Sequence, residues 1–375
     1  MIERLAACFT GLEDPRETRR CDHQLIDILV IAVCAVIACA ESWEDIELYG
    51  RSKQAWLETF LALPNGIPSH DTFRRVFMLL DPDAFEACFS RWAQSLAGEA
   101  GREVVAVDGK AVRRSGSRRH DHGPLHLVSA WASAQGLVLG QRAVDGKSNE
   151  ITAIPELLDT LRLEGCIVTL DAMGCQKEIA ERIRAKGADY LLVLKANHGR
   201  AFEAVREHFE RTCFGLGSGG RPVFDAFDES HGRLVRRRAF VDPAAKDLEP
   251  LRSWPELSAV LAVETVRGVT GSGKVETEIR YFLTSCGDDP AVLVQAIRRH
   301  WSVENALHWV LDVTFREDLS RVRHGHAPEN LAILRHFALN LLRQDRAVRG
   351  SVATKRLRAA LNDTYLRSLL DGLSV

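Results

Sequence analysis

The feature that most constrains the fold is an alternation of short apolar strands and helices between residues 103 and 194. Consecutive strands come first, and an alternation of strands and helices follows. The expected strands are Glu103–Val107, Leu125–Ser133, Gly136–Val144, Cys166–Leu170 and Tyr190–Leu194, and the expected helices are Glu150–Leu161 and Gln176–Lys186. A meander followed by such alternation predicts an α/β fold with a mixed sheet and flanking helices.

The segments on either side of this pattern have other characters. Residues 1–97 read as helical, and the helix Asp22–Ala40 is apolar nearly all round, as expected for the centre of a bundle. A short helix after Pro68 carries Arg74 and Arg75 and is either a DNA-reading element or a packing helix. We therefore predict a helical N-terminal domain (1–97), an α/β domain (98–345) with a β-rich insertion at about 199–290, and a basic helical tail (346–375).

Composition favours a cytoplasmic protein. The chain has 375 residues, a formal net charge of −2 and nine cysteines without metal-site spacing, which indicates reduced thiols. Its longest apolar run, Ile28–Ala40, is shorter than the roughly 18 residues of a membrane span, and the start of the chain lacks signal-peptide character. Because the net charge is small, any nucleic-acid partner must be bound by local basic patches.

The segment Arg298–Arg323 has the most concentrated chemistry. Apolar residues at helical spacing predict a helix on which Glu304 lies at the border of the apolar stripe, facing a protein-lined cleft. Basic side chains surround this acid: Arg298, Arg299, His300, Arg316, Arg321 and Arg323. A carboxylate among cations suits an enzyme acting on phosphodiesters. The alternative is a buried helix whose charges pair with one another.

Two further acids follow apolar strands directly. Asp108 comes after Glu103–Val107, and Asp171 comes after Cys166–Leu170. Strand ends in an open sheet are places where functional groups project, although Asp-Gly is also a common turn dipeptide. If Asp108, Asp171 and Glu304 converge, a set of carboxylates without Cys or His favours Mg²⁺ or Mn²⁺, and two such ions support an in-line phosphoryl displacement.

Basic residues also follow the first aspartate. Lys110, Arg113, Arg114, Arg118 and Arg119 form the densest basic run and are expected to contact phosphates. A second patch, which includes Arg236–Arg238, lies in the insertion. His308 is either a group that assists Glu304 or a core histidine, and the second interpretation is favoured. Trp301 and Trp309 either stack on an unpaired base or belong to the core.

Five segments resemble the transposases of H-repeat-associated bacterial insertion sequences. They are Leu63–Phe73, Val105–Ser115, Thr169–Ala180, Tyr190–Asn197 and His300–Asp318. This group belongs to the DDE superfamily, so the resemblance implies a ribonuclease-H-like catalytic domain, a metal-binding triad of Asp108, Asp171 and Glu304, and a homodimer on DNA. At the positions of the family's Tyr, Arg and Lys around the glutamate stand Ile297, His300 and Leu311. That signature is not matched. Arg298 or Arg299 could bind the phosphate in place of the family's Arg, and Asp312, Glu317 or Asp318 could assist Glu304.

The function expected from sequence is DNA transposition. The enzyme would cleave double-stranded DNA at element ends and transfer the strand to target DNA, with two Mg²⁺ or Mn²⁺ ions and no nucleotide cofactor. Two alternatives stay open: a transposase-derived DNA-binding protein that is no longer mobile, and a metal-dependent nuclease without strand transfer.

Overall fold

The computed structural model describes residues 5, 7–17, 21–97, 102–116, 123–144, 149–215, 220–230, 233–269 and 275–371. Contacts divide the chain into two units, each assembled from separate segments: unit 1 is 1–99, 109–161 and 303–375, and unit 2 is 100–108 and 162–302. One boundary between the two units falls inside a continuous strand, β1 (Val104–Val112), between Asp108 and Gly109. The predicted boundary near residue 98 lies outside the described residues, and the linear domain division stays a prediction.

Unit 1 is largely helical. Its helices and strands are α2 (Leu25–Ile37), α3 (Trp43–Ser52), α4 (Gln54–Leu57), α5 (His70–Leu79), α6 (Pro82–Leu96), β2 (Leu125–Ala132), β3 (Leu137–Ala143), α7 (Glu150–Thr160), α11 (Trp309–Val313), α12 (Ala327–Gln344), α13 (Val352–Leu361) and α14 (Asp363–Leu370). The apolar sequence of α2 explains its burial from Asp27 to Ile37, and α12 is buried along most of its length. Phe337 of α12 packs against Phe85 and Phe89 of α6.

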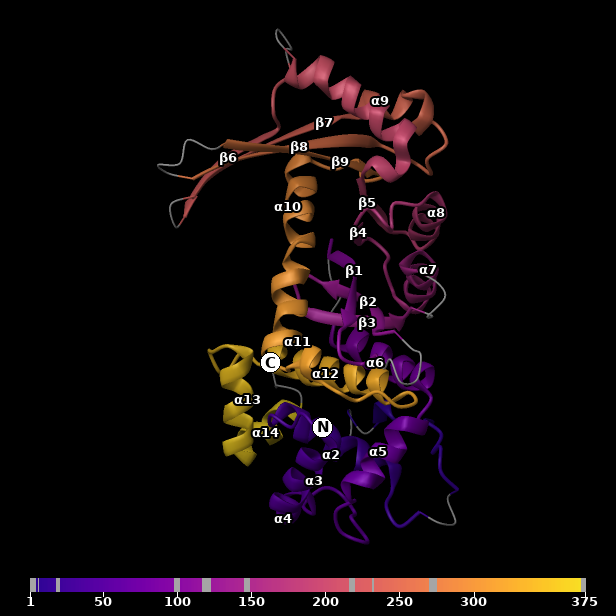
Figure 1. The fold of residues 1–375 in the computed structure, drawn as a ribbon, viewed down its shortest axis with the longest axis vertical. Helices are drawn as coiled ribbons and strands as arrows, with labels where there is room; N and C mark the ends of the chain where they lie inside the picture. Colours follow the sequence, from indigo (N-terminus) through magenta and orange to yellow (C-terminus); the bar gives the residue numbers. More distant parts are fainter. Residues whose placement is uncertain are drawn as a thin grey trace. The chain divides into compact units, whose positions relative to one another are not determined.

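Unit 2 contains most of the sheet. Its elements are the first part of β1 (Val104–Val112), β4 (Ile167–Leu170), α8 (Lys177–Ala185), β5 (Asp189–Leu194), α9 (Gly199–Phe209), β6 (Phe224–Ser230), β7 (Arg233–Asp242), β8 (Ala259–Val269), β9 (Val275–Thr284) and α10 (Pro290–His300). Leu293, Ala296 and Ile297 of α10 pack on Val104, Ile167 and Leu191 in the main hydrophobic core of this unit. Figure 1 shows α10 beside these strands.

The strands form one mixed sheet in the order β3-β2-β1-β4-β5-β9-β8-β7-β6. β1, β4 and β5 run parallel, whereas β2 and β3 pair antiparallel. This confirms the predicted α/β class with a mixed sheet and flanking helices. The predicted insertion supplies β6–β9, which extend the sheet because β9 pairs antiparallel with β5.

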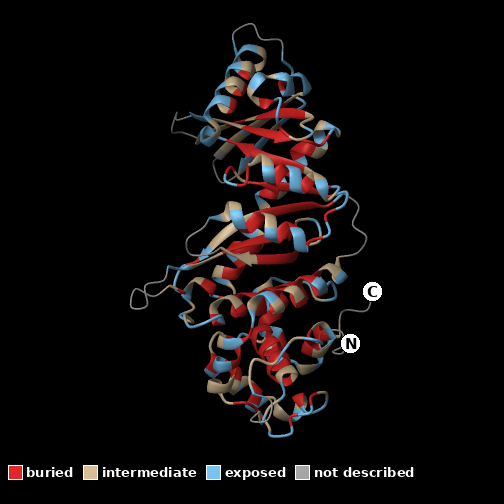
Figure 2. Cartoon of the chain, turned by 90° about the vertical axis from the view of Figure 1, so that its right-hand side faces the viewer, coloured by how far each residue is buried: buried red, intermediate tan, exposed pale blue. Residues whose placement is uncertain are grey.

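The buried residues lie mainly where strands and helices pack against each other. Figure 2 shows the buried residues concentrated on the strands and on the inner faces of the helices. β1 runs through Asp108 and Gly109 to Val112, so the expectation that the strand stops at Asp108 is wrong, and so is the alternative that Asp-Gly forms a turn there. No helix among the described residues is long and apolar enough to cross a membrane.

Candidate active site

Asp108 lies on β1, and Asp171 is the first residue after the adjacent parallel strand β4. The register of β1 and β4 pairs Val104 with Ile167 and continues to Val107 with Leu170. Asp108 and Asp171 follow this last pair, and adjacent strands lie about 4.8 Å apart. The parallel pairing therefore brings together two acids that are 63 positions apart in the sequence.

Both carboxylates point to the face of the sheet that α10 covers. Side chains alternate along a strand, so Asp108 shares the face of Val104, and Asp171 shares that of Ile167; both apolar residues pack on α10. Asp171 Oδ1 accepts hydrogen bonds from the backbone N–H groups of Met173 at 2.9 Å and Gly174 at 3.4 Å. The local turn thus fixes this carboxylate at the strand end.

His300, at the end of α10, is buried on the same face. Its Nδ1 lies 2.9 Å from Thr169 Oγ1, and burial lowers the pKa of its imidazole to about 4 despite the opposing charge of Asp171. A neutral, buried imidazole is not a phosphate-binding cation. We therefore assign His300 a structural role instead of the predicted DNA contact.

Glu304 lies on a turn of π-helix, Glu304–His308, which continues directly into α11. Its side chain is 68% exposed, so the expectation that it points into a protein-lined cleft and away from bulk water is wrong. His308 is buried, as the favoured interpretation required, yet its Nδ1 lies 3.3 Å from Glu304 Oε2. Burial lowers the pKa of His308, and Glu304 opposes that effect. Extra residues in a helical turn of this kind are frequent at functional sites.

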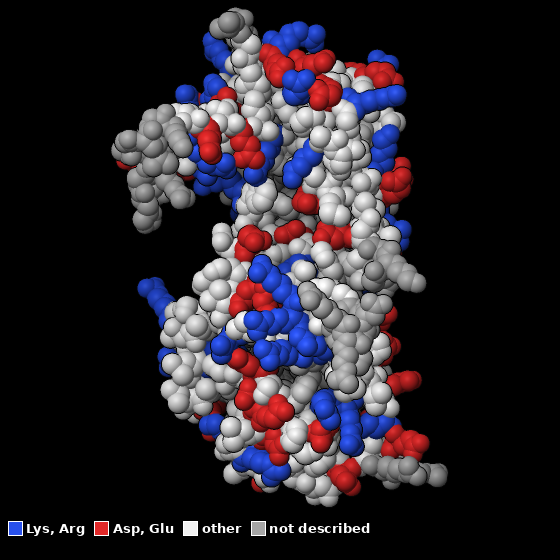
Figure 3. All heavy atoms as spheres, viewed as in Figure 1, with Lys and Arg blue, Asp and Glu red and all other residues white. Residues whose placement is uncertain are grey.

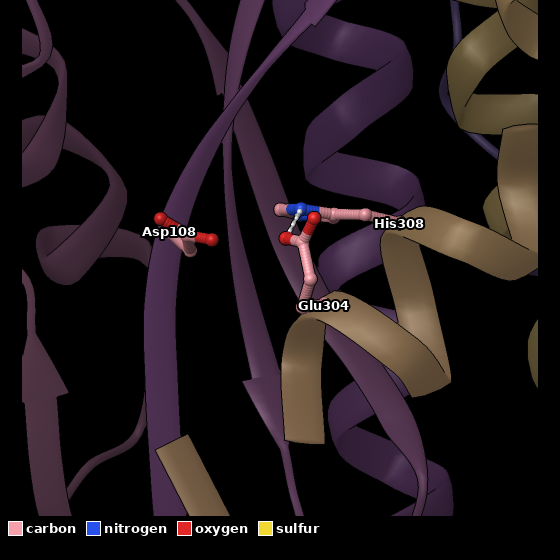
Figure 4. Close-up of side chains that lie close together, drawn as sticks. All are labelled: Asp108, Glu304 and His308. Carbon is pink, nitrogen blue, oxygen red and sulfur yellow. Dashed lines mark hydrogen bonds and ion pairs between the residues drawn. The ribbon is translucent and has the colours of Figure 1, made fainter. Parts of the chain in front are cut away.

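Asp108 lies next to this turn because β1 is continuous. Gly109 and Lys110, the following residues of the strand, belong to the same unit as Glu304, and Lys110 shares the Asp108 face of β1. Ligand atoms of Asp108, Glu304 and His308 all lie within 4.8 Å of one another, and Figure 4 shows the Asp108 carboxylate directed from β1 toward Glu304. Two carboxylates and an imidazole at this spacing fit a divalent cation. Among the described residues this group includes His308 and does not include Asp171.

Lys110 stands in a network of acids that the sequence did not indicate. Its Nζ lies 2.7 Å from both Asp312 and Glu317 and 3.7 Å from Asp318, and its side chain is only 11% exposed. Arg335 reaches the same glutamate at 3.3 Å. Burial alone would raise the pKa of Glu317, but Lys110 and Arg335 outweigh it and hold this pKa at about 2. We assign Lys110 to this internal network and not to phosphate contact.

The other predicted basic contacts occupy several environments. Arg113 is 81% exposed and pairs with Asp318 at 3.1 Å, while Arg316, with a left-handed backbone, pairs with Glu41 at 3.3 Å. Arg323 Nε donates to the Arg114 backbone carbonyl at 2.9 Å, and Arg321 and Arg323 line a cavity of about 310 Å³ that also contains Glu41 and Glu44. Arg118 and Arg119 lie outside the described residues. The DNA contacts of this set stay a prediction.

Trp301 and Trp309 are both exposed, so the interpretation that they belong to the core is wrong. The guanidinium of Arg280 lies 4.6 Å from the centroid of the Trp301 ring. Arg298 is exposed, and Arg299 is half-buried. Arg280 and Arg335 were not among the predicted site residues, because no local pattern connects them to partners on distant elements.

Comparison with protein families identifies two matching segments. Residues 6–93 match the domain described as DDE_Tnp_1-associated, and residues 99–341 match the transposase DDE domain. The second match covers more than half of the chain and contains all three acids of the predicted triad.

Individual proteins are similar over the full chain. The H repeat-associated putative transposase YhhI of Escherichia coli (strain K12) is 37% identical over 99% of this chain and 98% of its own. The putative transposase YncI of Escherichia coli O157:H7 is 39% identical over 100% and 96%. A piggyBac transposase synaptic complex with hairpin DNA covers 99% of this chain and 78% of its own at 12% identity with a TM-score of 0.41, a similarity too low to carry an inference.

Proposed function

This chain belongs to the transposase DDE domain family, and from that premise we propose that it cuts DNA at the ends of a mobile element and joins them to target DNA. One observation carries the proposal. The β1–β4 register leads into Asp108 and Asp171 side by side, and ligand atoms of Glu304 and His308 lie within 4.8 Å of one from Asp108.

We propose that Asp108, Asp171 and Glu304 hold divalent metal ions, Mg²⁺ or Mn²⁺. Bound ions of this class activate a hydroxyl nucleophile and stabilise the leaving oxygen of a phosphodiester. His308 orients the Glu304 carboxylate through its Nδ1, and Asp171 is oriented by the N–H groups of its own turn. Rigid placement of the acids matters because phosphoryl transfer depends mainly on positioning and electrostatics.

The partner in this proposal is double-stranded DNA, both as element ends and as target. Two copies of the chain, one for each end, would act together as a homodimer. Nothing in the proposed reaction requires a nucleotide cofactor.

Nicking of a supercoiled plasmid tests the proposal. The plasmid carries the coding sequence of this chain with its natural flanks, and the purified protein is added with Mg²⁺ or Mn²⁺. We expect nicked circles and joined products from the unaltered protein, and a loss of more than about 100-fold for Asp108→Asn, Asp171→Asn and Glu304→Gln, since even outer-shell partners of a metal contribute roughly 10–100-fold. Glu181→Gln, on the exposed face of α8, is the matched control.

Other outcomes distinguish the alternatives. Binding of the flanking DNA without metal-dependent cleavage would indicate a DNA-binding protein that has lost its chemistry. Cleavage without joining of a pre-cut end would indicate a nuclease. Cleavage by the three acid variants at the rate of Glu181→Gln would remove the proposed site.

A further inference from the structure

Unit 2 contains a basic cleft between one face of the β6–β9 sheet and α10. Its volume is about 510 Å³, and its lining includes Arg237, Arg267, Arg280, Arg298, Asp228 and Trp301. Figure 3 shows Lys and Arg side chains gathered beneath the ends of β6–β8, beside α10. None of these residues belongs to the proposed metal site. We call this feature the arginine cleft.

The alternation of side chains along β7 separates two groups of arginines. Arg237 points into the arginine cleft, whereas Arg236 and Arg238 point to the opposite face of the sheet. On that opposite face each arginine has its own acid: Arg236 Nη2 lies 2.7 Å from Asp225, and Arg238 Nε lies 2.6 Å from Glu264. These pairs neutralise Arg236 and Arg238 on the outer face.

The charges of the arginine cleft are not balanced in this way. Arg237 pairs with Asp228 at 2.7 Å, but Arg267 and Arg280 share the single carboxylate of Glu278, at 3.0 and 2.6 Å. For Arg298 the described part of the chain offers no hydrogen bond or ion pair. Among the described residues on this face, four guanidinium groups thus face three carboxylates, because Glu276 lies opposite Arg267 in the β8–β9 register. The excess favours a polyanionic ligand, because unneutralised like charges in a cleft repel one another until a counter-charge binds.

The shape of the cleft suits a phosphate chain in particular. Guanidinium groups present paired N–H donors that match phosphate oxygens, and those of Arg237, Arg267, Arg280 and Arg298 line one continuous space. Trp301 adds an exposed aromatic wall with Arg280 stacked on it. The same helix, α10, carries His300, which contacts Thr169 two residues before Asp171. The cleft therefore adjoins the helix that covers the proposed catalytic face.

We propose that the arginine cleft binds the phosphodiester backbone of duplex DNA, with Arg298 and Arg267 as its main phosphate contacts. This inference rests on the proposed function, since it assigns a holding site for the same DNA. Arg237, Arg267 and Arg280 become DNA-binding residues through it. Arg236 and Arg238, which belong to the same basic patch in the sequence, do not.

Fluorescence anisotropy with a labelled 40-base-pair duplex tests the cleft. Affinity of the full chain is measured from low to moderate salt without divalent metal. For Arg267→Gln/Arg298→Gln we expect weaker binding and a slope of log affinity against log salt that is shallower by about 2, since each lost phosphate contact removes about one unit. Arg267→Gln/Arg298→Lys, which keeps the positive charge at position 298, should have a steeper slope than Arg267→Gln/Arg298→Gln.

The matched control is Arg206→Gln/Arg236→Gln, which removes the same charge from arginines paired with acids outside the cleft. Its salt slope should equal that of the unaltered protein. Equal slopes for both double variants would overturn the proposal, whether both are unchanged or both reduced. Circular dichroism confirms that each variant is folded. Because this assay contains no metal, its result is independent of whether the chain cleaves DNA, so the two proposals fail separately.

Discussion

Lys110 is the residue that connects β1 to the acids following the Glu304 turn. Its ammonium compensates Glu317, which is 1% exposed, and links β1 to Asp312 just beyond the His308 turn. We predict that Lys110→Met costs about 3–5 kcal/mol in unfolding free energy, because it leaves a buried carboxylate with too little compensation. Urea denaturation followed by circular dichroism measures this loss.

Arg113→Gln is the control for that change. Arg113 pairs with Asp318 near the same network but is 81% exposed, so its loss should cost no more than about 1 kcal/mol. Similar costs for the two variants would show that the buried position of Lys110 adds nothing to the strength of its ion pairs.

Glu86 gives a prediction for the dependence of stability on pH. It is buried in α6 and accepts hydrogen bonds from the Gln141 N–H and the Ser90 hydroxyl, and burial raises its pKa to about 8. The folded chain therefore keeps a proton that the unfolded chain releases above about pH 4.3. This contribution to stability is fully present below that pH and is lost as pH rises toward 8.

Glu86→Gln should remove this pH dependence. Between pH 5.5 and 7.5 the unaltered protein is expected to lose up to about 1.4 kcal/mol per pH unit from this one group, and the variant should lose less by that amount. Unfolding free energies at three pH values measure the difference. An unchanged slope would mean that Glu86 is ionised in the folded protein.

At the scale of elements, β1 has a close contact at Gly109. A Cβ there would lie 2.1 Å from Glu150 Oε1 and 2.9 Å from His126 Nε2, two atoms that now interact at 2.7 Å. We predict that Gly109→Ala separates this pair and costs roughly 1–3 kcal/mol, as overpacking does. Adding Glu150→Ala should recover part of the loss in chemical denaturation, and additive losses in the double variant would refute this steric explanation.

Some features of the strands and helices could be predicted from the sequence, and others could not. The strands that precede Asp108 and Asp171 were predictable, because apolar runs and their ends are local signals. The continuation of β1 through Asp-Gly was not, since pairing in a sheet overrides the turn preference of that dipeptide. The π-helical turn at Glu304 likewise depends on tertiary packing, which explains why helical periodicity misjudged the exposure of Glu304.

At the scale of the whole molecule, the N-terminal helices and the C-terminal segments build one unit. Phe337 of α12 lies 4.8–5.9 Å, between ring centroids, from Phe9, Phe85, Phe89 and Trp92. Asn330 Nδ2 donates to the backbone carbonyls of Phe77 and Leu80, both at 2.9 Å. The sequence indicates that 1–97 is a helical segment. It does not indicate that residues more than 200 positions later complete the core of this segment.

A truncated chain tests this interdependence. A fragment of residues 102–375 would expose the aromatic and apolar face of α12, so we expect aggregation or a broad, low-temperature unfolding transition. Size-exclusion chromatography and thermal circular dichroism give the result. A monomeric fragment with a sharp transition near that of the full chain would show that the first 101 residues fold separately.

The central claim is that Asp108, Asp171 and Glu304 form a shared site for divalent metal ions. Electron paramagnetic resonance of Mn²⁺ titrated into the full chain with duplex DNA counts bound ions directly. The account predicts two ions per chain for the unaltered protein and for Glu181→Gln, and fewer for Asp108→Asn and Asp171→Asn. Absence of bound Mn²⁺ in the unaltered protein, or equal binding in the aspartate variants, would contradict it.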